Sequence, residues 1–478
     1  MGRCVRQLRK IVKSVVPYAV EARHIRRRYG RVDVTDAIGE FELPRWLRAV
    51  LCALPYGLTK AWLTRRFCPV SWQEHQAAFP AVVARLGAKV RAGERLNVLF
   101  LVSDAAMFAA ESLYCAMSRD PLFAPRIAVI PDFRRLPERV EREMDRCADA
   151  LCAKYAAECV MRLRPDAAGA WPDVVRGADI VCYPLPYDFS HGKYSIRRSA
   201  GLDVLPIHVN YGFYRSLFDR EVMKKENYAR FWRVFLECDY TMREYAAFSL
   251  TRGTNAALTG YVKMDALADV RPVAHRRRRV LVALHHSVAG GKNEELRLAT
   301  VMERAAYLDR LPDAYPEIDF IFRPHPYLLQ TLAQENVWGR EKTDEFVRRL
   351  RAKSNVIWSE GGNGFQEFAD SDACIQDCGS FLVEYLYTGK PCCYLLHSPA
   401  DVDAKFAPLG KACLEQCTIA CTNDEIDAFV RDVVIAGRDE KEHSRRALAD
   451  SVMVNYPHAA EEALGAIRRA LTEEESHD

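Results

Sequence analysis

The sequence lacks the features that mark a membrane-spanning or exported chain. Its most apolar N-terminal stretch, Trp46 to Leu63, is interrupted by Arg48, Pro55 and Lys60, so it does not supply the roughly 20 clean apolar residues of a membrane span. The basic segment Met1 to Lys13 is not followed by an apolar core and a cleavage site, so we expect no signal peptide.

Paired cysteines of the C-x-x-C type are also absent, although the chain has 16 cysteines. In a long chain without an export signal we expect reduced thiols rather than disulfides. Cys413, Cys417 and Cys421 recur every four residues but have no histidine partner, which is poor geometry for a tetrahedral zinc site. We therefore expect no metal at these cysteines.

The chain has little net charge, +4 over 478 residues, which argues against a nucleic-acid-binding coat. The charge is unevenly placed, because the first 66 residues hold fifteen Lys and Arg but only five Asp and Glu. Two interpretations of this basic, Trp-bearing segment fit equally well. It either contacts an anionic membrane surface peripherally, or it is a helical region packed on the next domain with a solvated basic face.

What the sequence does contain is ordinary globular composition, 49% apolar and 28% charged residues, in an alternation of apolar strands and amphipathic helices. This rhythm is typical of βαβ units and predicts parallel sheets covered by helices on both faces. The expected strands of a first set are Leu96–Val102, Arg126–Ile130, Cys159–Leu163, Ile180–Tyr183, Leu205–Asn210 and Cys238–Thr241. Those of a second set are Val280–Leu284, Asp319–Phe322, Asn355–Trp358, Ala373–Gln376, Pro391–Leu396 and Thr418–Ala420.

The restart at Val280 predicts two doubly wound α/β domains in series that face a cleft. The expected boundaries are 1–92 for a basic, mostly helical N-terminal segment, 93–270 and 271–440 for the two domains, and 441–478 for a C-terminal helix with an acidic tail. Ligands in open α/β sheets bind at the carboxyl ends of the strands. The polar residues that follow the strands are therefore the candidates for function.

The first candidate is the turn Asp377-Cys378-Gly379-Ser380, between an expected strand and an expected helix. Free backbone N–H groups and a hydroxyl at a helix N-terminus can bind a diphosphate. Glu384, one turn further, can accept hydrogen bonds from ribose hydroxyls, or it is a surface residue of the helix. A strand, a Gly-Ser turn and a helix also occur in many α/β proteins without this function.

The second candidate is Arg323-Pro324-His325-Pro326, where two prolines fix the shape of the loop. Arg323 and His325 in such a loop can donate to phosphoryl oxygens and neutralise a leaving diphosphate; the alternative is a tight turn with a surface Arg and a packed His. His285 and Ser287 follow Val280–Leu284 at the same expected edge.

In the first domain, His208 lies at the end of an expected strand and is followed by Tyr211 and Tyr214 on the acceptor side. A neutral imidazole is a common proton acceptor near pH 7, so His208 is the candidate base for an acceptor hydroxyl. A lone histidine in an apolar strand is more often a satisfied core residue.

The order of these motifs resembles the CDP-glycerol glycerophosphotransferase family, the teichoic-acid and capsule polymerases of GT-B architecture, over roughly Leu96 to Val434. The matching phrases are Gly260-Tyr261-Val262-Lys263-Met264-Asp265, His285-His286-Ser287, Arg323 to Pro326, and Asp377, Gly379, Ser380 and Glu384. In two places the sequence departs from the family: His208 is followed by Val-Asn-Tyr-Gly rather than Gly, and Gly379 stands where the family has the first of two serines.

The resemblance implies a GT-B fold in which Arg323, His325, Ser380 and Glu384 hold the nucleotide diphosphate and His208 lies near the acceptor. It implies transfer of glycerol phosphate from a CDP-linked donor to a cell-surface polysaccharide or lipid-linked acceptor, with CMP released and with no metal or other cofactor required. The alternatives are a glycosyltransferase that uses a nucleotide sugar, and a nucleotide- or glycan-binding scaffold without catalysis. The expected location is the cytoplasm, peripheral on the inner face of the bacterial cell membrane.

Overall fold

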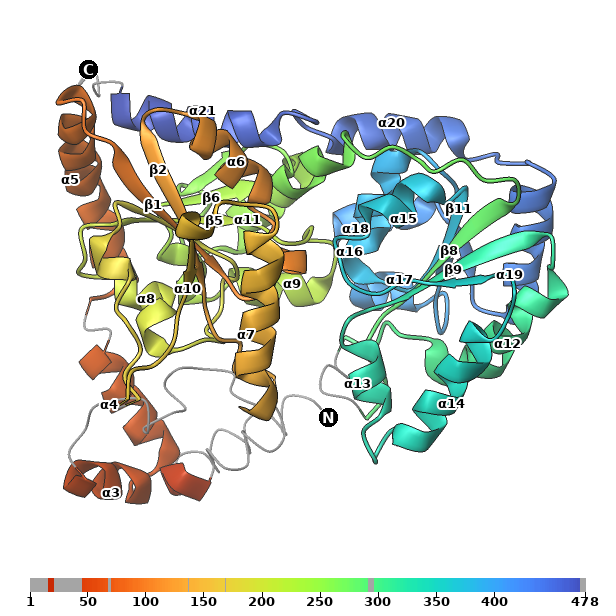
Figure 1. Cartoon of the computed structure of the whole chain (residues 1–478), viewed down its shortest axis with the longest axis horizontal. Helices are drawn as coiled ribbons and strands as arrows, with labels where there is room; N and C mark the ends of the chain where they lie inside the picture. Colours follow the sequence, from red (N-terminus) through yellow and green to blue (C-terminus); the bar gives the residue numbers. More distant parts are fainter. Residues whose placement is uncertain are drawn as a thin grey trace.

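The computed structural model describes residues 16–20, 45–67, 70–135, 137–167, 169–290 and 296–472. These residues form two α/β domains side by side, with a pair of helices below the first domain (Figure 1). The prediction of two Rossmann-like, doubly wound parallel-sheet domains in the GT-B arrangement is confirmed. None of the described helices is long and apolar enough to cross a membrane.

The N-terminal domain is built on a seven-stranded parallel sheet of order β3-β2-β1-β4-β5-β6-β7. Its strands are β1 (Leu96–Val102), β2 (Phe123–Val129), β3 (Val160–Arg162), β4 (Ile180–Tyr183), β5 (Leu205–Val209), β6 (Arg233–Leu236) and β7 (Ala256–Leu258). Its helices are α5 (Trp72–Arg91), α6 (Glu111–Arg119), α7 (Pro137–Cys152), α8 (Ile196–Ser199), α9 (Leu217–Met223), α10 (Glu226–Ala229) and α11 (Asp239–Phe248). The strand predicted at Cys238–Thr241 is wrong, because Cys238 is the N-cap of α11 and the preceding strand ends at Leu236.

The C-terminal domain repeats this topology with a six-stranded parallel sheet of order β10-β9-β8-β11-β12-β13. Its strands are β8 (Arg278–Leu284), β9 (Ile318–Pro324), β10 (Val356–Trp358), β11 (Ala373–Gln376), β12 (Cys392–Leu395) and β13 (Thr418–Ala420). Its helices are α12 (Val301–Ala314), α13 (Leu328–Leu332), α14 (Arg340–Arg351), α15 (Phe365–Asp370), α16 (Gly379–Glu384), α17 (Asp401–Lys405), α18 (Pro408–Glu415) and α19 (Asn423–Phe429). Helix α19 opens with a capping box, in which Thr422 Oγ1 accepts from the N–H of Glu425 and the Glu425 carboxylate accepts from the N–H of Thr422.

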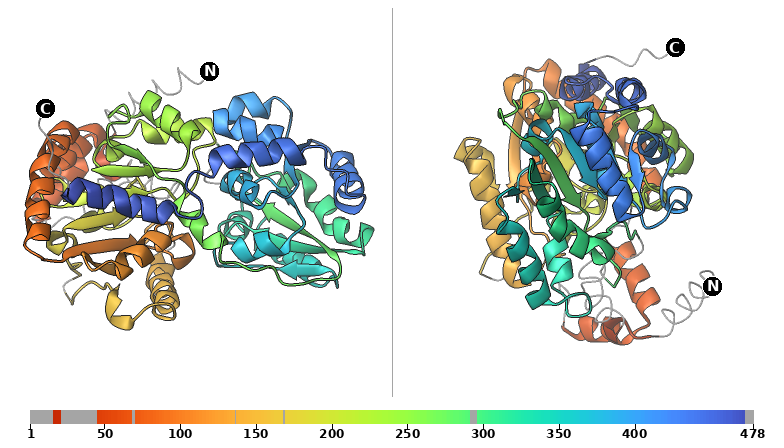
Figure 2. Two further views of the ribbon diagram at one scale, coloured as in Figure 1. Left: turned by 90° about the horizontal axis from the view of Figure 1, so that it is seen from above. Right: turned by 90° about the vertical axis from the view of Figure 1, so that its right-hand side faces the viewer.

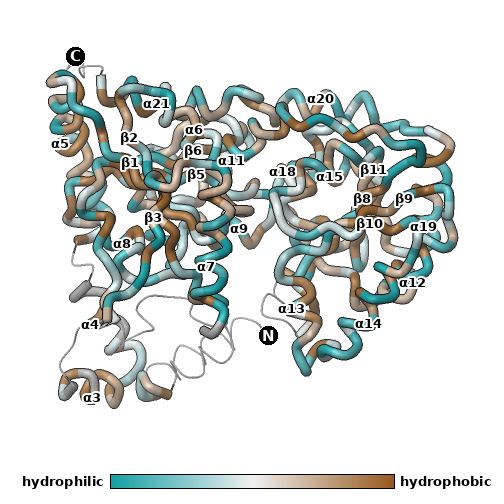
Figure 3. The backbone as a smooth tube through the Cα atoms, in the orientation of Figure 1, coloured by the Kyte–Doolittle hydropathy of each residue, from teal (hydrophilic) through white to brown (hydrophobic). Residues whose placement is uncertain are grey.

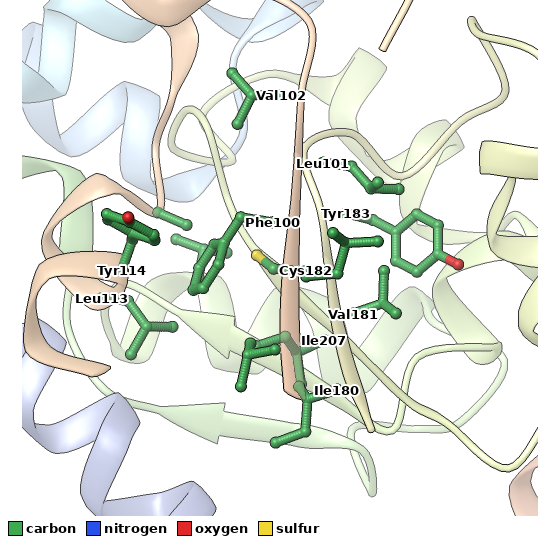
Figure 4. Packing of buried hydrophobic residues seen from close by; sticks show 14 of the residues in the cluster. Phe100, Leu101, Val102, Leu113, Tyr114, Ile180, Val181, Cys182, Tyr183 and Ile207 are labelled. Atoms are coloured by element: carbon green, nitrogen blue, oxygen red, sulfur yellow. The ribbon is translucent and has the colours of Figure 1, made fainter. Parts of the chain in front are cut away.

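Each sheet is covered by helices on both faces, as the tube coloured by hydropathy and the two turned views show (Figures 2 and 3). The continuous apolar run of β1 lies at the centre of the N-terminal core, where the ring of Phe100 meets Tyr114 of α6 edge-on at 5.5 Å between centroids (Figure 4). Strands buried on both faces read as unbroken apolar runs, which explains why the sequence identifies β1 and β8 so clearly.

The C-terminal helices α20 (Glu442–Val452) and α21 (Ala459–Thr472) join the two domains along one edge of the molecule (Figure 1). Helix α21 returns to the N-terminal domain, where Ile467 and Leu471 are buried in its core. The first turn of α21 is held by Asp265, whose carboxylate accepts from the N–H groups of Ala459 and Ala460 at 3.2 and 2.7 Å. Asp265 therefore caps the helix that fastens the domains together.

Replacing Asp265 with alanine should destabilise the protein by about 1–2 kcal/mol, because two N–H groups at the start of α21 lose their acceptor. Thermal unfolding measures this. The control is Asp269→Ala, which removes an exposed carboxylate in the same segment and should leave the midpoint unchanged. An Asp265→Ala protein as stable as the control would contradict a capping role.

Candidate active site

A cleft of about 2470 Å³ lies between the domains. Its N-terminal wall comes from the ends of β1 and β2 and from α7, and its C-terminal wall from the end of β9, the loop after β10, and α13 and α14. The lining residues include ten Lys and Arg but six Asp and Glu. The cleft therefore has an excess of positive charge and favours an anionic ligand.

Three histidines meet at the end of the C-terminal sheet beside this cleft. The parallel pairing of β8 with β9 places Leu284 opposite Pro324, so the next residues, His285 and His325, leave the sheet together. The ring centroids of His285 and His325 are 5.4 Å apart, and His286 lies 4.1 Å from His325. His325 lines the cleft, whereas His285 is 5% exposed.

The hydrogen bonds of two of these rings fix which nitrogen carries the proton. Nδ1 of His325 accepts from the backbone N–H of Tyr327 at 3.1 Å, and Nδ1 of His285 accepts from the N–H of Ser287 at 3.2 Å. A backbone N–H can only donate, so each Nδ1 is unprotonated and the neutral ring carries its hydrogen on Nε2. Both side chains are therefore built as N–H donors.

Burial keeps these rings neutral. It lowers the pKa of His285 and His325 well below the usual value and that of His286 to about 4. Ring nitrogens of the three lie within 4.8 Å of one another, which within the described residues makes them the one group of three potential metal ligands. With Nδ1 engaged and hydrogen on Nε2 in two of the rings, the cluster is better suited to an oxyanion than to a cation.

Arg323 lines the cleft but uses its terminal nitrogens within the protein. Nη1 donates to Ser359 Oγ at 2.9 Å and to Glu367 Oε1 at 2.8 Å, and Nη2 donates to the carbonyl oxygens of Gly361 and Gly362. Both glycines have positive φ, 78° and 62°. Arg323 thus fixes a glycine loop on the wall of the cleft, which leaves little donor capacity for a phosphate.

Asp377 and Ser287 also act within the scaffold. The buried carboxylate of Asp377 accepts from the N–H of His285 at 2.6 Å and from the N–H and hydroxyl of Thr300, and burial raises its pKa to about 6. Ser287 Oγ accepts from the N–H of Leu298 at 2.9 Å and hydrogen-bonds His285 Nδ1 at 2.7 Å. Together they connect β11, the histidine loop and the start of α12.

The predicted diphosphate turn at Gly379 and Ser380 faces the other domain. The guanidinium of Arg215 lies where a Cβ of residue 379 would be, so any side chain there would displace it. Nη1 of Arg215 bonds the Phe213 carbonyl and Asp219. A loop of the N-terminal domain therefore covers the start of α16, and Ser380 is partly exposed beside it.

Glu384 is fully buried at the same interface. Its Oε1 accepts from Lys263 Nζ at 2.8 Å and from the hydroxyl of Tyr261 at 3.2 Å. The residues of the Gly-Tyr-x-x-x-Asp motif thus have two roles. Tyr261 and Lys263 donate hydrogen bonds to Glu384, and Asp265 caps α21. A ribose would have to share or replace the Lys263 contact.

The predicted acceptor residues lie outside the cleft lining, and His208 and Tyr214 meet at Asn210. His208 is fully buried, with Nδ1 2.9 Å from the carbonyl of Tyr183 and Nε2 3.1 Å from Asn210 Oδ1. Tyr214 is buried and donates to Asn210 Oδ1 at 3.0 Å, whereas Tyr211 is 38% exposed. None of these lines the cleft, so an acceptor role for His208 stays a prediction.

Three lining residues on the N-terminal wall were missed from the sequence. Asp104 follows β1, and Arg134 and Arg135 follow β2. Arg135 Nη2 donates to Asp104 at 2.6 Å, and its guanidinium lies 6.0 Å from the ring of Tyr327 across the cleft. Their position in the segments that follow two strands is the signal that would have found them.

Two Asp-x-Asp triplets, Asp370-Ser371-Asp372 and Asp401-Val402-Asp403, lie outside the cleft lining. Asp370 and Asp372 accept from the backbone N–H groups of Val273 and Arg279. The carboxylates of Asp370 and Asp372 therefore support the fold.

Comparisons with known proteins give fold likeness only. No family model matches the chain, and no curated protein matches it. A putative UDP-N-acetylglucosamine 2-epimerase from Listeria monocytogenes is 13% identical, covering 80% of this chain and 98% of that chain with a TM-score of 0.48. The UDP-GlcNAc 2-epimerase from Neisseria meningitidis bound to UDP-GlcNAc is 11% identical, covering 78% and 100%, with a TM-score of 0.46.

A variant of the wall teichoic acid polymerase TagF is 12% identical to this chain, covering 82% of it and 97% of that chain, with a TM-score of 0.49. Identities of 11–13% and TM-scores below 0.5 assign neither a substrate nor a site residue to this chain.

The burial of His208 makes a prediction about pH. Its pKa is lowered to about 4, chiefly by burial, while the unfolded chain binds a proton near pH 6.5. The neutral His208 ring therefore makes its full contribution to the stability of the folded state above pH 6.5. This contribution falls as the pH drops toward 4, and about 2 kcal/mol of it is lost at pH 5. Melting midpoints at pH 7.5 and 5 should differ less in His208→Gln than in the wild type. The exposed His443→Gln is the control, and an equal pH effect in all three proteins would contradict this assignment.

The fit of Arg215 against Gly379 predicts a coupled pair. Gly379→Ser should destabilise the protein by about 1–3 kcal/mol, because the new Cβ overlaps the guanidinium. Adding Arg215→Ala should remove most of that cost, which a double-mutant cycle of unfolding free energies measures. Additive effects of the two substitutions would show that the side chains do not compete for this space.

Proposed function

We propose that the chain is a transferase that moves a glycerol-phosphate unit from a CDP-linked donor to a hydroxyl of a cell-surface polysaccharide or teichoic-acid-type acceptor, releasing CMP. The observation that carries the proposal is the pair of neutral Nε2–H donors, His285 and His325, at the carboxyl ends of two adjacent strands beside a positively charged cleft. The CDP-linked donor is inferred from the order of motifs in the sequence.

In the proposed reaction an oxygen of the acceptor attacks the β-phosphorus of the donor. The new O–P bond forms as the bond from phosphorus to the bridging oxygen breaks, and CMP leaves with that electron pair. His325 donates a hydrogen bond to the charge that develops on the phosphoryl oxygens or the leaving oxygen. Because the His325 ring is neutral, it stabilises this charge through a well-placed hydrogen bond rather than through a full positive charge.

The acceptor hydroxyl must lose its proton in the same step. The sequence-based candidate for the base is His208, which has to become accessible from its buried position. Asp104 is the other candidate, because it lies on the N-terminal wall of the cleft and its side chain is 30% exposed. The cations of the cleft supply the positive field and the neutral histidines supply N–H donors, so the proposal requires no metal or other cofactor.

A nucleotide-sugar glycosyltransferase is the first alternative, with attack at the anomeric carbon and departure of a nucleoside diphosphate from the same cleft. A binding scaffold without catalysis is the second, and it is favoured by the internal occupation of Arg323 and Glu384. For both transferases we propose a nucleotide-linked donor, and for the scaffold a nucleotide or a glycan. Peripheral contact of the N-terminal segment with a membrane that carries a lipid-linked acceptor is a separate proposal, which none of the three functions requires.

The proposal predicts that His325→Ala lowers the rate of CMP release from CDP-glycerol by about 10²–10³-fold, the usual cost of one lost oxyanion donor. His325→Gln should recover part of the rate because its amide offers an N–H donor. His443→Ala, at an exposed site, is the control and should keep the wild-type rate. Equal rates in the wild type and His325→Ala would remove His325 from the reaction.

Ligand binding is tested separately by thermal shifts with CMP, CDP and UDP. A shift with CMP or CDP supports the cytidine donor, and one with UDP alone favours the glycosyltransferase. No shift with any nucleotide would reject both transferase functions, whereas binding without turnover of CDP-glycerol or nucleotide sugars would favour the scaffold.

A further inference from the structure

Helices α3 (Arg45–Ala53) and α4 (Tyr56–Phe67) carry a second apolar face that contacts neither domain core. Five large apolar side chains recur at every fourth position of the sequence and are exposed; four lie on the two helices, and Leu54 lies in the short link between them. We call them the apolar stripe: Trp46 (68% exposed), Val50 (49%), Leu54 (40%), Leu58 (63%) and Trp62 (39%).

The opposite face of the same helices already has partners. Leu51 and Leu63 are buried, and the ring of Tyr56 stacks on Tyr18 at 5.4 Å between centroids. Backbone hydrogen bonds from Tyr18 to Leu54 and from Tyr56 to Val16 fasten residues 16–20 to this face. One face of the helix pair is therefore packed within the protein, whereas the side chains of the apolar stripe remain exposed.

Several large exposed apolar side chains gathered in one short segment mark an interaction site, because the surfaces of soluble proteins seldom carry them. Residues 43–73 contain five Lys and Arg and no Asp or Glu. An apolar stripe with tryptophans at both ends in a purely basic segment matches the interface of an anionic bilayer, which takes up apolar side chains, holds indole rings at headgroup level and attracts cations. Helices of 9 and 12 residues suit a position in the plane of that interface.

The place of the helix pair in the fold relates this surface to the cleft. In Figures 1 and 2, α3 and α4 lie on the side of the molecule toward which α7 and α14 also extend, and α20 and α21 run along the opposite side. Helices α7 and α14 line the two walls of the cleft. A bilayer against α3 and α4 would therefore lie on the same side as these walls.

We propose that the apolar stripe is the surface by which this chain lies on an anionic lipid bilayer, with Trp46 and Trp62 at the level of the headgroups. This surface presents the cleft to an acceptor carried on a membrane lipid. The choice of acceptor rests on the proposed function, whereas bilayer contact itself does not.

Co-sedimentation of the full chain with vesicles tests the proposal without any substrate. The wild type should bind vesicles of phosphatidylglycerol and phosphatidylcholine, and more weakly as salt is raised. Trp46→Glu with Leu58→Glu should weaken this binding by about tenfold or more. The matched control is Leu250→Glu with Val273→Glu, which adds the same charge at two other exposed apolar positions (40% and 56%) and should bind like the wild type.

Equal vesicle binding by the stripe variant and the control, at unchanged melting midpoints, would overturn the proposal. So would a lipid-free wild-type dimer that becomes a monomer in the stripe variant, because the stripe would then be an interface between copies. Nucleotide-induced thermal shifts in the same preparations report on the cleft alone. Their absence together with normal vesicle binding would reject the proposed function and leave the membrane surface standing.

Discussion

The in-register pairing of β8 with β9 is the constraint on which the candidate site depends. Seven residue pairs run from Arg278 opposite Ile318 to Leu284 opposite Pro324, and the histidines follow at once. A slip by one residue would turn every side chain of one strand to the other face and separate the rings. Asp377, at the end of the neighbouring β11, then fixes the His285 loop by accepting its N–H. The site is thus a product of strand register rather than of a flexible loop.

Burial decides whether a polar side chain near such a strand end binds a ligand or supports the fold. Arg323, Glu384 and His208 are polar side chains of the kind expected at a site, but each forms hydrogen bonds inside the protein. A buried polar group without a partner costs free energy, so these internal contacts are themselves favourable. A substrate gains from such a group only by replacing an existing bond. His325 differs, because its Nδ1 is fixed by Tyr327 while the ring borders the cleft.

The sequence predicts the fold class well because buried parallel strands are unbroken apolar runs; β1 and β4 coincide with their predicted bounds. It fails at Cys238–Thr241, where a short mixed run is a helix start whose identity depends on its neighbours in space. In the site, it finds His285 and His325 but not their tautomers, which depend on backbone N–H groups two residues further along. The Arg215 contact with Gly379 is also invisible in the sequence, because these residues are far apart in the chain and belong to different domains.

The two kinds of positive potential in this cleft have different physical properties. Charged side chains such as Arg139 and Arg348, on α7 and α14, act over distance and are screened by salt. The Nε2–H groups of His285 and His325 are neutral and directional, so they act only at contact and are nearly insensitive to salt. The charged side chains attract any anion, whereas the Nε2–H groups bind only an anion that is placed correctly for a hydrogen bond. Under the proposed function, the charged walls concentrate the anionic donor, and the Nε2–H of His325, which lines the cleft whereas His285 does not, selects the position of its phosphoryl oxygen.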